Sequence, residues 1–136
     1  MNQTFGYSVL VDILQNTSAV TSKLDTFVVN ATTYYAIFSG RMIPANYQDL
    51  NKTLQIYRTS PVDSGDYNEI TYTINCRQTN EKDAEALAKL VYDATNRVFD
   101  DYSGSVVYLR SRINSAILEE ENCVNCPVDV RVGNSL

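Results

Sequence analysis

Hydrophobic and polar residues alternate along much of the second half of this 136-residue chain. In "TLQIYRT", residues 53–59, the apolar residues Leu54 and Ile56 occupy alternate positions. Alternate positions are also apolar in "EITYTINC", residues 69–76. A period of two places alternate side chains on opposite faces of a strand, and the turn-rich "SPVDSGDYN" separates the two segments. We therefore predict two antiparallel strands, of which the second turns four residues inward: Ile70, Tyr72, Ile74 and Cys76.

A helical period replaces the alternation after Asn80. Asp83 follows three residues later, which approximates a capping box, and an apolar stripe at helical spacing comes next. The stripe consists of Ala84, Leu87, Ala88, Val91, Ala94 and Val98. It predicts a helix that ends before "DDYSGS" and packs one face on the sheet.

The remaining parts of the chain add further elements. Residues 4–16 carry a second helical stripe, with Thr4 as the expected N-cap. Residues 25–46 mix β-branched and aromatic residues with Gly40 and Pro44, which predicts short irregular strands and a loop. Near the C-terminus, "VVYLRSRI" and "VDVRV" alternate again and predict a hairpin around an acidic turn; their inward residues are Val107, Leu109, Ile113, Val128, Val130 and Val132.

Together these elements predict one α+β domain over residues 1–136. We expect a mainly antiparallel or mixed sheet of about four or more strands, an N-terminal helix, and one amphipathic helix packed on one face. The length suits a single hydrophobic core.

Composition and charge exclude several classes of protein. The net charge is −5 and the chain has no histidine, whereas a nucleic-acid reader needs a basic surface. No apolar run is long enough to cross a bilayer, and no basic segment precedes the short apolar stretch near the N-terminus. We therefore expect no membrane segment and no signal peptide.

Candidate catalytic groups are few. Glu119, Glu120 and Glu121 are consecutive, as are Asp100 and Asp101, and we expect both groups to be solvated acids in turns. The segment "CRQTNEKD" has no glycine, so the turn into the helix is not a phosphate-binding loop. The sequence predicts no catalytic residue, no cofactor and no enzyme activity.

The three cysteines allow two readings. Cys123 and Cys126 have the spacing of a redox motif, but Pro127 and an alternating strand follow them instead of a helix. A zinc site would have to add Cys76 and a carboxylate or a ligand from another subunit. We expect ordinary reduced thiols in a turn and no metal, with thiol or zinc chemistry as the alternative; Cys76 should behave as a small core residue.

The outward face of the sheet and one loop are candidate assembly surfaces. The outward phase of the strand over residues 106–113 contains Tyr108, Arg110 and Arg112, and neighbouring strands add Tyr57, Thr71, Thr73 and Arg131. Tyrosine and arginine are enriched in protein interfaces, although a solvated antiparallel face is an equal alternative. The loop over residues 60–68 is longer than a tight hairpin needs; its candidate contact residues are Ser60, Asp63, Asp66 and Tyr67.

The order of elements resembles the tail terminator and related tail-completion or neck proteins of long-tailed bacteriophages. The similarity begins near Tyr34 and includes "SGRMIP", "IYRTSP" and "YTINCRQTNEKDAEALAKLVYDATNRVF". The cysteine-bearing turn "EEENCVNCP" departs from the family pattern. The resemblance supplies no catalytic residues.

This resemblance implies a structural virion protein, assembled in the host cytoplasm. It would form a homo-oligomeric ring, usually a hexamer, that ends the tail tube and joins it to neck or connector proteins. DNA would pass through without sequence-specific binding, which suits an acidic protein. The alternatives are a head–tail adaptor or stopper, a small cytosolic binding module and, last, a cysteine-dependent enzyme or zinc protein.

Overall fold

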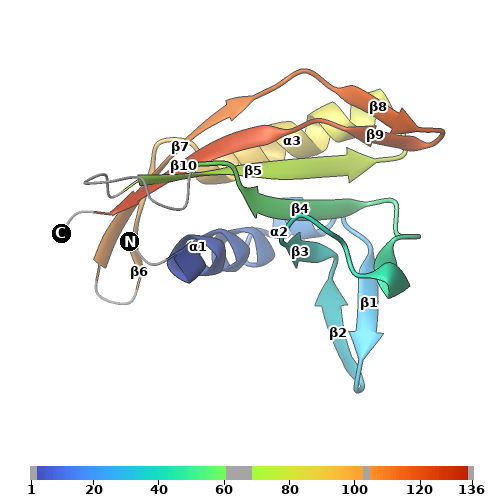
Figure 1. Cartoon of the computed structure of the whole chain (residues 1–136), viewed down its shortest axis with the longest axis horizontal. Helices are drawn as coiled ribbons and strands as arrows, with labels where there is room; N and C mark the ends of the chain where they lie inside the picture. The colour runs from blue at the N-terminus through green and yellow to red at the C-terminus, as the bar shows by residue number, and fades with distance from the viewer. Residues whose placement is uncertain (1–2, 61–68, 103–104, 135–136) are drawn as a thin grey trace.

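The computed structural model describes residues 3–60, 69–102 and 105–134. It is an α+β fold, as predicted, and its described strands form one eight-stranded mixed sheet and one separate two-stranded hairpin (Figure 1). The helices are α1 (Gln3–Gln15), α2 (Ser18–Thr21), η1 (Ala45–Tyr47) and α3 (Glu81–Thr95). The strands are β1 (Thr26–Val29), β2 (Thr32–Tyr35), β3 (Ile37–Ser39), β4 (Thr53–Arg58), β5 (Glu69–Gln78), β6 (Val98–Tyr102), β7 (Ser105–Ile113), β8 (Ile117–Glu120), β9 (Cys123–Asn125) and β10 (Val128–Asn134).

The last strand lies inside the large sheet and not at its edge. The strand order is β3-β4-β5-β10-β7-β6, and β9 pairs with both β5 and β8. The β4–β5 and β7–β10 pairs are antiparallel, as the alternation predicted, whereas β3 and β4 are parallel. The long strand β5 is therefore central, with β4 on one side and both β10 and β9 on the other.

One face of the sheet packs against α1 and α3 to form the hydrophobic core. Every predicted inward residue of β5 and β10 is buried, and Leu54, Ile56, Val107 and Leu109 join them. Ile113 has the inward phase, but it stands at the end of β7 and its relative exposure is 37%. The period-two pattern thus identified the core face correctly, because burial on one face fixes the phase of each strand.

Helix α3 begins where its sequence predicted but ends earlier. Asn80 accepts a hydrogen bond from the main-chain nitrogen of Asp83 at 2.9 Å and donates one to its carboxylate at 2.8 Å. The helix stops at Thr95, and Val98 belongs to β6, so its assignment to the helical stripe was wrong. The physical reason is a tertiary contact, because the Ser111 hydroxyl of β7 donates to the Thr95 carbonyl at 2.9 Å.

Helix α1 packs against β5 through a glycine. Thr4 lies inside this helix, so its prediction as N-cap was wrong. Gly6 rests directly on the phenol of Tyr72, which is fully buried, and the Tyr7 ring meets the same phenol edge-on at 4.9 Å. Burial, and then the neighbouring Tyr7, raise the pKa of Tyr72 to about 12.

Strands β1 and β2 form an arm that projects away from the large sheet (Figure 1). Asn30 and Ala31 connect them with φ angles of 49° and 67°, as a tight two-residue hairpin turn requires. At the base of the arm, the Phe27 ring stacks on Phe38 at 5.5 Å and lies 4.4 Å from Tyr47. Aromatic packing therefore fixes the arm to the body.

The acidic segment near the C-terminus is a hairpin and not a simple turn. β8 and β9 pair antiparallel, and β9 also continues the sheet beside β5. This hairpin lies at the end of the molecule opposite the start of α1 and the end of β10 (Figure 1). Asp100 and Asp101 also lie in a strand, β6, so their placement in a turn was wrong. Among the helices that the structure describes, none is long and apolar enough to cross a membrane.

Shortening Leu87 tests the core side of α3. Leu87→Ala should lower the free energy of unfolding by about 2–4 kcal/mol, because the side chain is 1% exposed and its removal leaves a cavity. Urea denaturation followed by circular dichroism measures this change. Glu85→Ala, on the exposed side of the same helix, is the control and should change stability by less than about 0.5 kcal/mol. Equal midpoints for both variants would contradict the assigned core face.

Gly6→Ala tests the contact between α1 and β5. Alanine is the better helix former by about 1 kcal/mol, but its Cβ would overlap the buried Tyr72 ring. We expect a net destabilisation of about 1–3 kcal/mol, because the ring has no space to move. The same substitution in a Tyr72→Leu background should lose this penalty. A stabilising Gly6→Ala in the otherwise unchanged protein would refute the contact.

Candidate assembly surface

The face of the large sheet opposite α1 and α3 carries polar and charged side chains. We call it the open face; its side chains alternate with those of the core along β4, β5, β7 and β10. Its residues include Thr53, Gln55, Tyr57, Glu69, Thr71, Thr73, Asn75, Arg77, Tyr108, Arg110, Arg112, Asp129 and Arg131. The predicted phase of Tyr57, Tyr108, Arg110 and Arg112 is confirmed.

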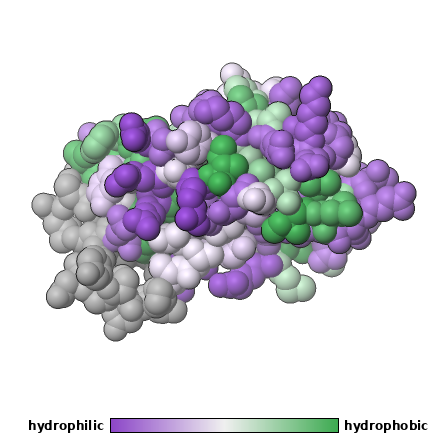
Figure 2. Space-filling model, turned by 90° about the horizontal axis from the view of Figure 1, so that it is seen from above, coloured by the Kyte–Doolittle hydropathy of each residue, from purple (hydrophilic) through white to green (hydrophobic). Residues whose placement is uncertain are grey.

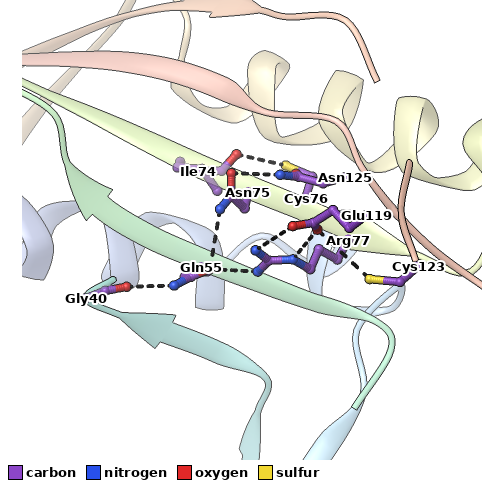
Figure 3. A network of polar contacts seen from close by, with 9 residues as sticks. All are labelled: Gly40, Gln55, Ile74, Asn75, Cys76, Arg77, Glu119, Cys123 and Asn125. Carbon is purple, nitrogen blue, oxygen red and sulfur yellow. Dashed lines mark hydrogen bonds and ion pairs between the residues drawn. The ribbon is translucent and has the colours of Figure 1, made fainter. Parts of the chain in front are cut away.

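A chain of amide side chains stabilises one end of the open face (Figure 3). The Asn125 side-chain amide donates to Asn75 at 2.9 Å, and Asn75 donates to Gln55 at 3.3 Å. Gln55 in turn donates to the Gly40 carbonyl at 2.9 Å. These three side chains are buried, and buried amides are tolerated when they are hydrogen-bonded to one another. This series of hydrogen-bonded amides joins β9, β5, β4 and the segment after β3.

Arg77 links this amide chain to the β8–β9 hairpin (Figure 3). Its Nη1 donates to Gln55 at 2.7 Å, and its Nε and Nη2 contact the Glu119 carboxylate at 2.6 and 3.4 Å. The Arg77 side chain is 17% exposed and that of Glu119 is 33% exposed. Two-point pairing of this kind fixes the geometry of both groups. Glu119 is therefore a structural partner and not a freely solvated acid.

Asp129 is the counter-ion in the next row of the open face, where it lies opposite Arg112. It accepts from the Thr73 hydroxyl at 2.7 Å and from the Asn114 amide at 3.0 Å. Arg112, predicted as an interface residue, contacts the same carboxylate at 3.4 Å. The charge of Asp129 is thus already shared among three neighbours within its own chain.

Arg110 and Arg131 form a row without a counter-ion. They are directly opposite one another on β7 and β10, and Thr71 of β5 completes the row. Both arginines are exposed, and neither has a hydrogen bond or ion pair with any residue that the structure describes. Like charges in directly opposite positions destabilise a sheet. This row borders a hollow of about 400 Å³, lined by Thr71, Arg110, Ser111, Arg112, Asp129 and Arg131.

Arg41 and Arg77 line a second, smaller hollow on the same face. Its volume is about 230 Å³, and Gln55, Tyr57 and Asn75 complete its wall. The Arg41 guanidinium lies 5.1 Å from the centre of the Tyr57 ring, a cation–π distance. The sequence had not marked Arg41 or Arg77, because their partners are distant along the chain.

Two further predicted residues have structural contacts. Tyr108 is half-buried and donates to the Glu69 carboxylate at 3.1 Å, and its ring packs on Gly133, where a Cβ would collide with it. This hydrogen bond, more than burial, raises the pKa of Tyr108. Ser60 accepts a hydrogen bond from the Thr71 main chain at 3.3 Å and so closes the end of β4 onto β5.

Asp63, Asp66 and Tyr67, predicted as loop contacts, lie outside the described residues.

The cysteines lie in a strand environment and not in an open turn. Cys123 begins β9, and Cys126 follows this strand with its main-chain nitrogen bonded to the Cys76 carbonyl at 3.0 Å. Cys76 and Cys126 are buried and Cys123 is partly exposed; all three are free thiols. Burial raises the pKa of each thiol, and nearby Glu119 adds to this effect at Cys123. Within the described residues, no three histidine, cysteine or acidic side chains group as metal ligands.

The sequence did not identify the arm as an exposed surface. Val28 is 63% exposed, and Val29, Tyr34 and Tyr35 are exposed as well. An isolated two-stranded hairpin is at most marginally stable in water, and exposed apolar side chains on it have no benefit for a lone domain. The only sequence signal was the mixture of valine and tyrosine around Asn30.

Comparison with known proteins finds no match to this chain, whether among protein-family models, curated proteins or solved structures.

Thiol reactivity tests the environment of the cysteines. Because their pKa values are raised, the thiols stay protonated at neutral pH, and the thiolate is the reactive form. Native protein at pH 7.5 should therefore react slowly with iodoacetamide, first at Cys123, and the rate should rise with pH into the range above 9. Mass spectrometry of peptides gives the rate at each site, with urea-unfolded protein as control. Fast labelling of Cys126 in native protein at pH 7 would contradict this environment.

Proposed function

We propose that this protein is a structural virion protein that forms a ring, ends the phage tail tube and joins it to the neck. The open face is the observation that carries the proposal: it is the face opposite α1 and α3, and four of its residues are arginines. Tyrosine and arginine are the residue types that interfaces favour, because they combine contact area with hydrogen-bonding tips.

The arm and the resemblance to tail terminators support the same role. A hairpin with exposed valines and tyrosines offers apolar area beyond the outline of the body. Both surfaces lie on one chain at different places, as a ring needs when each subunit contacts two neighbours. The resemblance adds the place of the ring in the particle, at the head-proximal end of the tail.

A net charge of −5 fits a ring through which DNA passes. An acidic channel repels phosphate groups, so the nucleic acid would slide without being held. A head–tail adaptor would share the ring and the channel but would bind the connector and not the tail tube.

The proposal predicts assembly that depends on the arm. The purified protein, alone or with tail-tube protein, should reach six times its 15.3 kDa mass, about 92 kDa, in light scattering. Val28→Lys should preserve the fold, since the side chain is 63% exposed, and should reduce the assembled fraction by about tenfold. Ser22→Lys, exposed on the body, adds the same charge and should assemble normally.

Two results would overturn this proposal. If the wild-type protein stays monomeric at all concentrations, with tube and neck proteins present, the proposed ring is excluded. Ring formation with binding to the connector alone would assign the chain to the adaptor class.

A further inference from the structure

We propose that Arg110 and Arg131 bind the acidic tip of the β8–β9 hairpin of a second copy of this chain. The inference rests on the proposed ring and identifies one of its subunit contacts. The tip contributes the carboxylates of Glu120 and Glu121, and the two arginines provide the matching cations.

The arginine site is defined by an imbalance of charge: its positive charges have no counter-ion among the described residues. On the open face, Arg77 is paired with Glu119 and Arg112 with Asp129. In the row of Arg110 and Arg131, the third position is Thr71, which carries no charge. Glu69, two residues before Thr71 on the same face, accepts a hydrogen bond from Tyr108 at 3.1 Å. Asp129 lines the same hollow but already accepts from Thr73, Asn114 and Arg112. An external carboxylate would therefore relieve the repulsion between the two guanidinium groups and form charge-assisted hydrogen bonds.

The carboxylate site at the tip of the hairpin has the opposite imbalance, an excess of negative charge. Glu120 ends β8 and Glu121 begins the hairpin turn, and both are exposed. Neither has an ion pair with a described residue, whereas Glu119 is bound to Arg77. The Arg77–Glu119 pair holds β8 in position, so the two free acids are presented on an anchored hairpin. Two unpaired anions here match two unpaired cations on the open face.

Apolar side chains accompany the charges at both sites. Leu118 and Ile117 on β8 are 72% and 52% exposed. On the open face, Phe99 pairs with Tyr108, one row from Arg110, and is 76% exposed; Val106, two rows from Arg110, is 50% exposed. From above, the surface is mostly hydrophilic, with a hydrophobic patch toward the end where β8 and β9 lie (Figures 1 and 2). An interface core of apolar contacts with charged groups around it is the usual composition of a subunit contact.

The two sites are different patches that lie far apart on one subunit, and in the proposed ring they meet head to tail as a heterologous contact. On β5, Thr71 lies in the arginine row and Gln78 pairs with the hairpin. The seven residue steps between them correspond to about 23 Å. A contact between different patches on each copy propagates from subunit to subunit and closes into a ring if the rotation allows it.

Charge reversal and its rescue test this contact. Arg110→Glu with Arg131→Glu, and separately Glu120→Arg with Glu121→Arg, should each raise the concentration for half-assembly by about tenfold or more. An equimolar mixture of the two variants should assemble again, because every contact in an alternating ring then pairs opposite charges. The control, Lys23→Glu with Lys82→Glu, makes the same charge change at exposed sites elsewhere and should assemble as wild type. Light scattering measures assembly at about 0.05 and 0.5 M salt, and circular dichroism confirms folding; Arg110→Gln with Arg131→Gln replaces any variant that does not fold.

The outcomes separate this contact from the proposed function. If wild type assembles and either reversed variant assembles at the same concentration, or if the folded mixture is not rescued, this contact is wrong while the ring stands. If wild type does not assemble with any tail or neck partner, the proposed function fails, and the contact fails with it.

Discussion

Pairing between β5 and β10 is the interaction on which the rest of the sheet depends. Among the described strands, β7 and β6 reach the other half of the sheet through β10. The six residue pairs of this ladder, from Val128 opposite Ile74 to Gly133 opposite Glu69, keep the apolar residues of both strands on the side of the helices. A shift by one residue would turn the valines of β10 toward the open face and would turn Asp129 and Arg131 into the core, so the register is strongly determined.

The two faces of β5 are stabilised by different physical means. On the helix side, apolar side chains are removed from water, and the packing is tight enough that Gly6 is needed next to Tyr72. On the open side, Asn75 is also buried, but it is stabilised by hydrogen bonds to Gln55 and Asn125. The amide end of the open face is thus held together by hydrogen bonds within the chain, although the buried Asn125 Oδ1 has no partner among the described residues. The arginine end has no counter-ion among the described residues, and this is where we propose the subunit contact.

Local patterns predicted the parts of the fold that local rules determine. Alternation identified the inward residues of β4, β5 and β10, because a period of two follows from strand geometry and one-sided burial. Asn80 identified the start of α3, since its cap involves a residue only three positions away. Val98 was misassigned, because the helix is ended by hydrogen bonds from Ser111 on a distant strand and not by a local breaker.

The candidate site was predictable only in part, for a related reason. The alternation along the strand placed Tyr108 and Arg110 on one face. Whether a charged side chain has a counter-ion depends on neighbours that only the fold brings near. The sequence could not distinguish Glu119, which binds Arg77, from Glu120, which has no such partner. The strand β8 was read as part of an acidic turn, because glutamate is uncommon in strands and the Arg77 contact that compensates it comes from β5.

The position of β10 inside the sheet also affects the order in which the chain can fold. Its partners on β5 are between 54 and 64 residues earlier in the sequence, so this ladder is non-local and slow to form. Until residue 128 and those after it have been synthesised, one long edge of β5 has no partner, and its apolar residues are only partly covered. An unpaired edge of this kind readily accepts a strand from another molecule. During rapid synthesis of many copies, exchange of β10 between nascent chains would compete with correct folding.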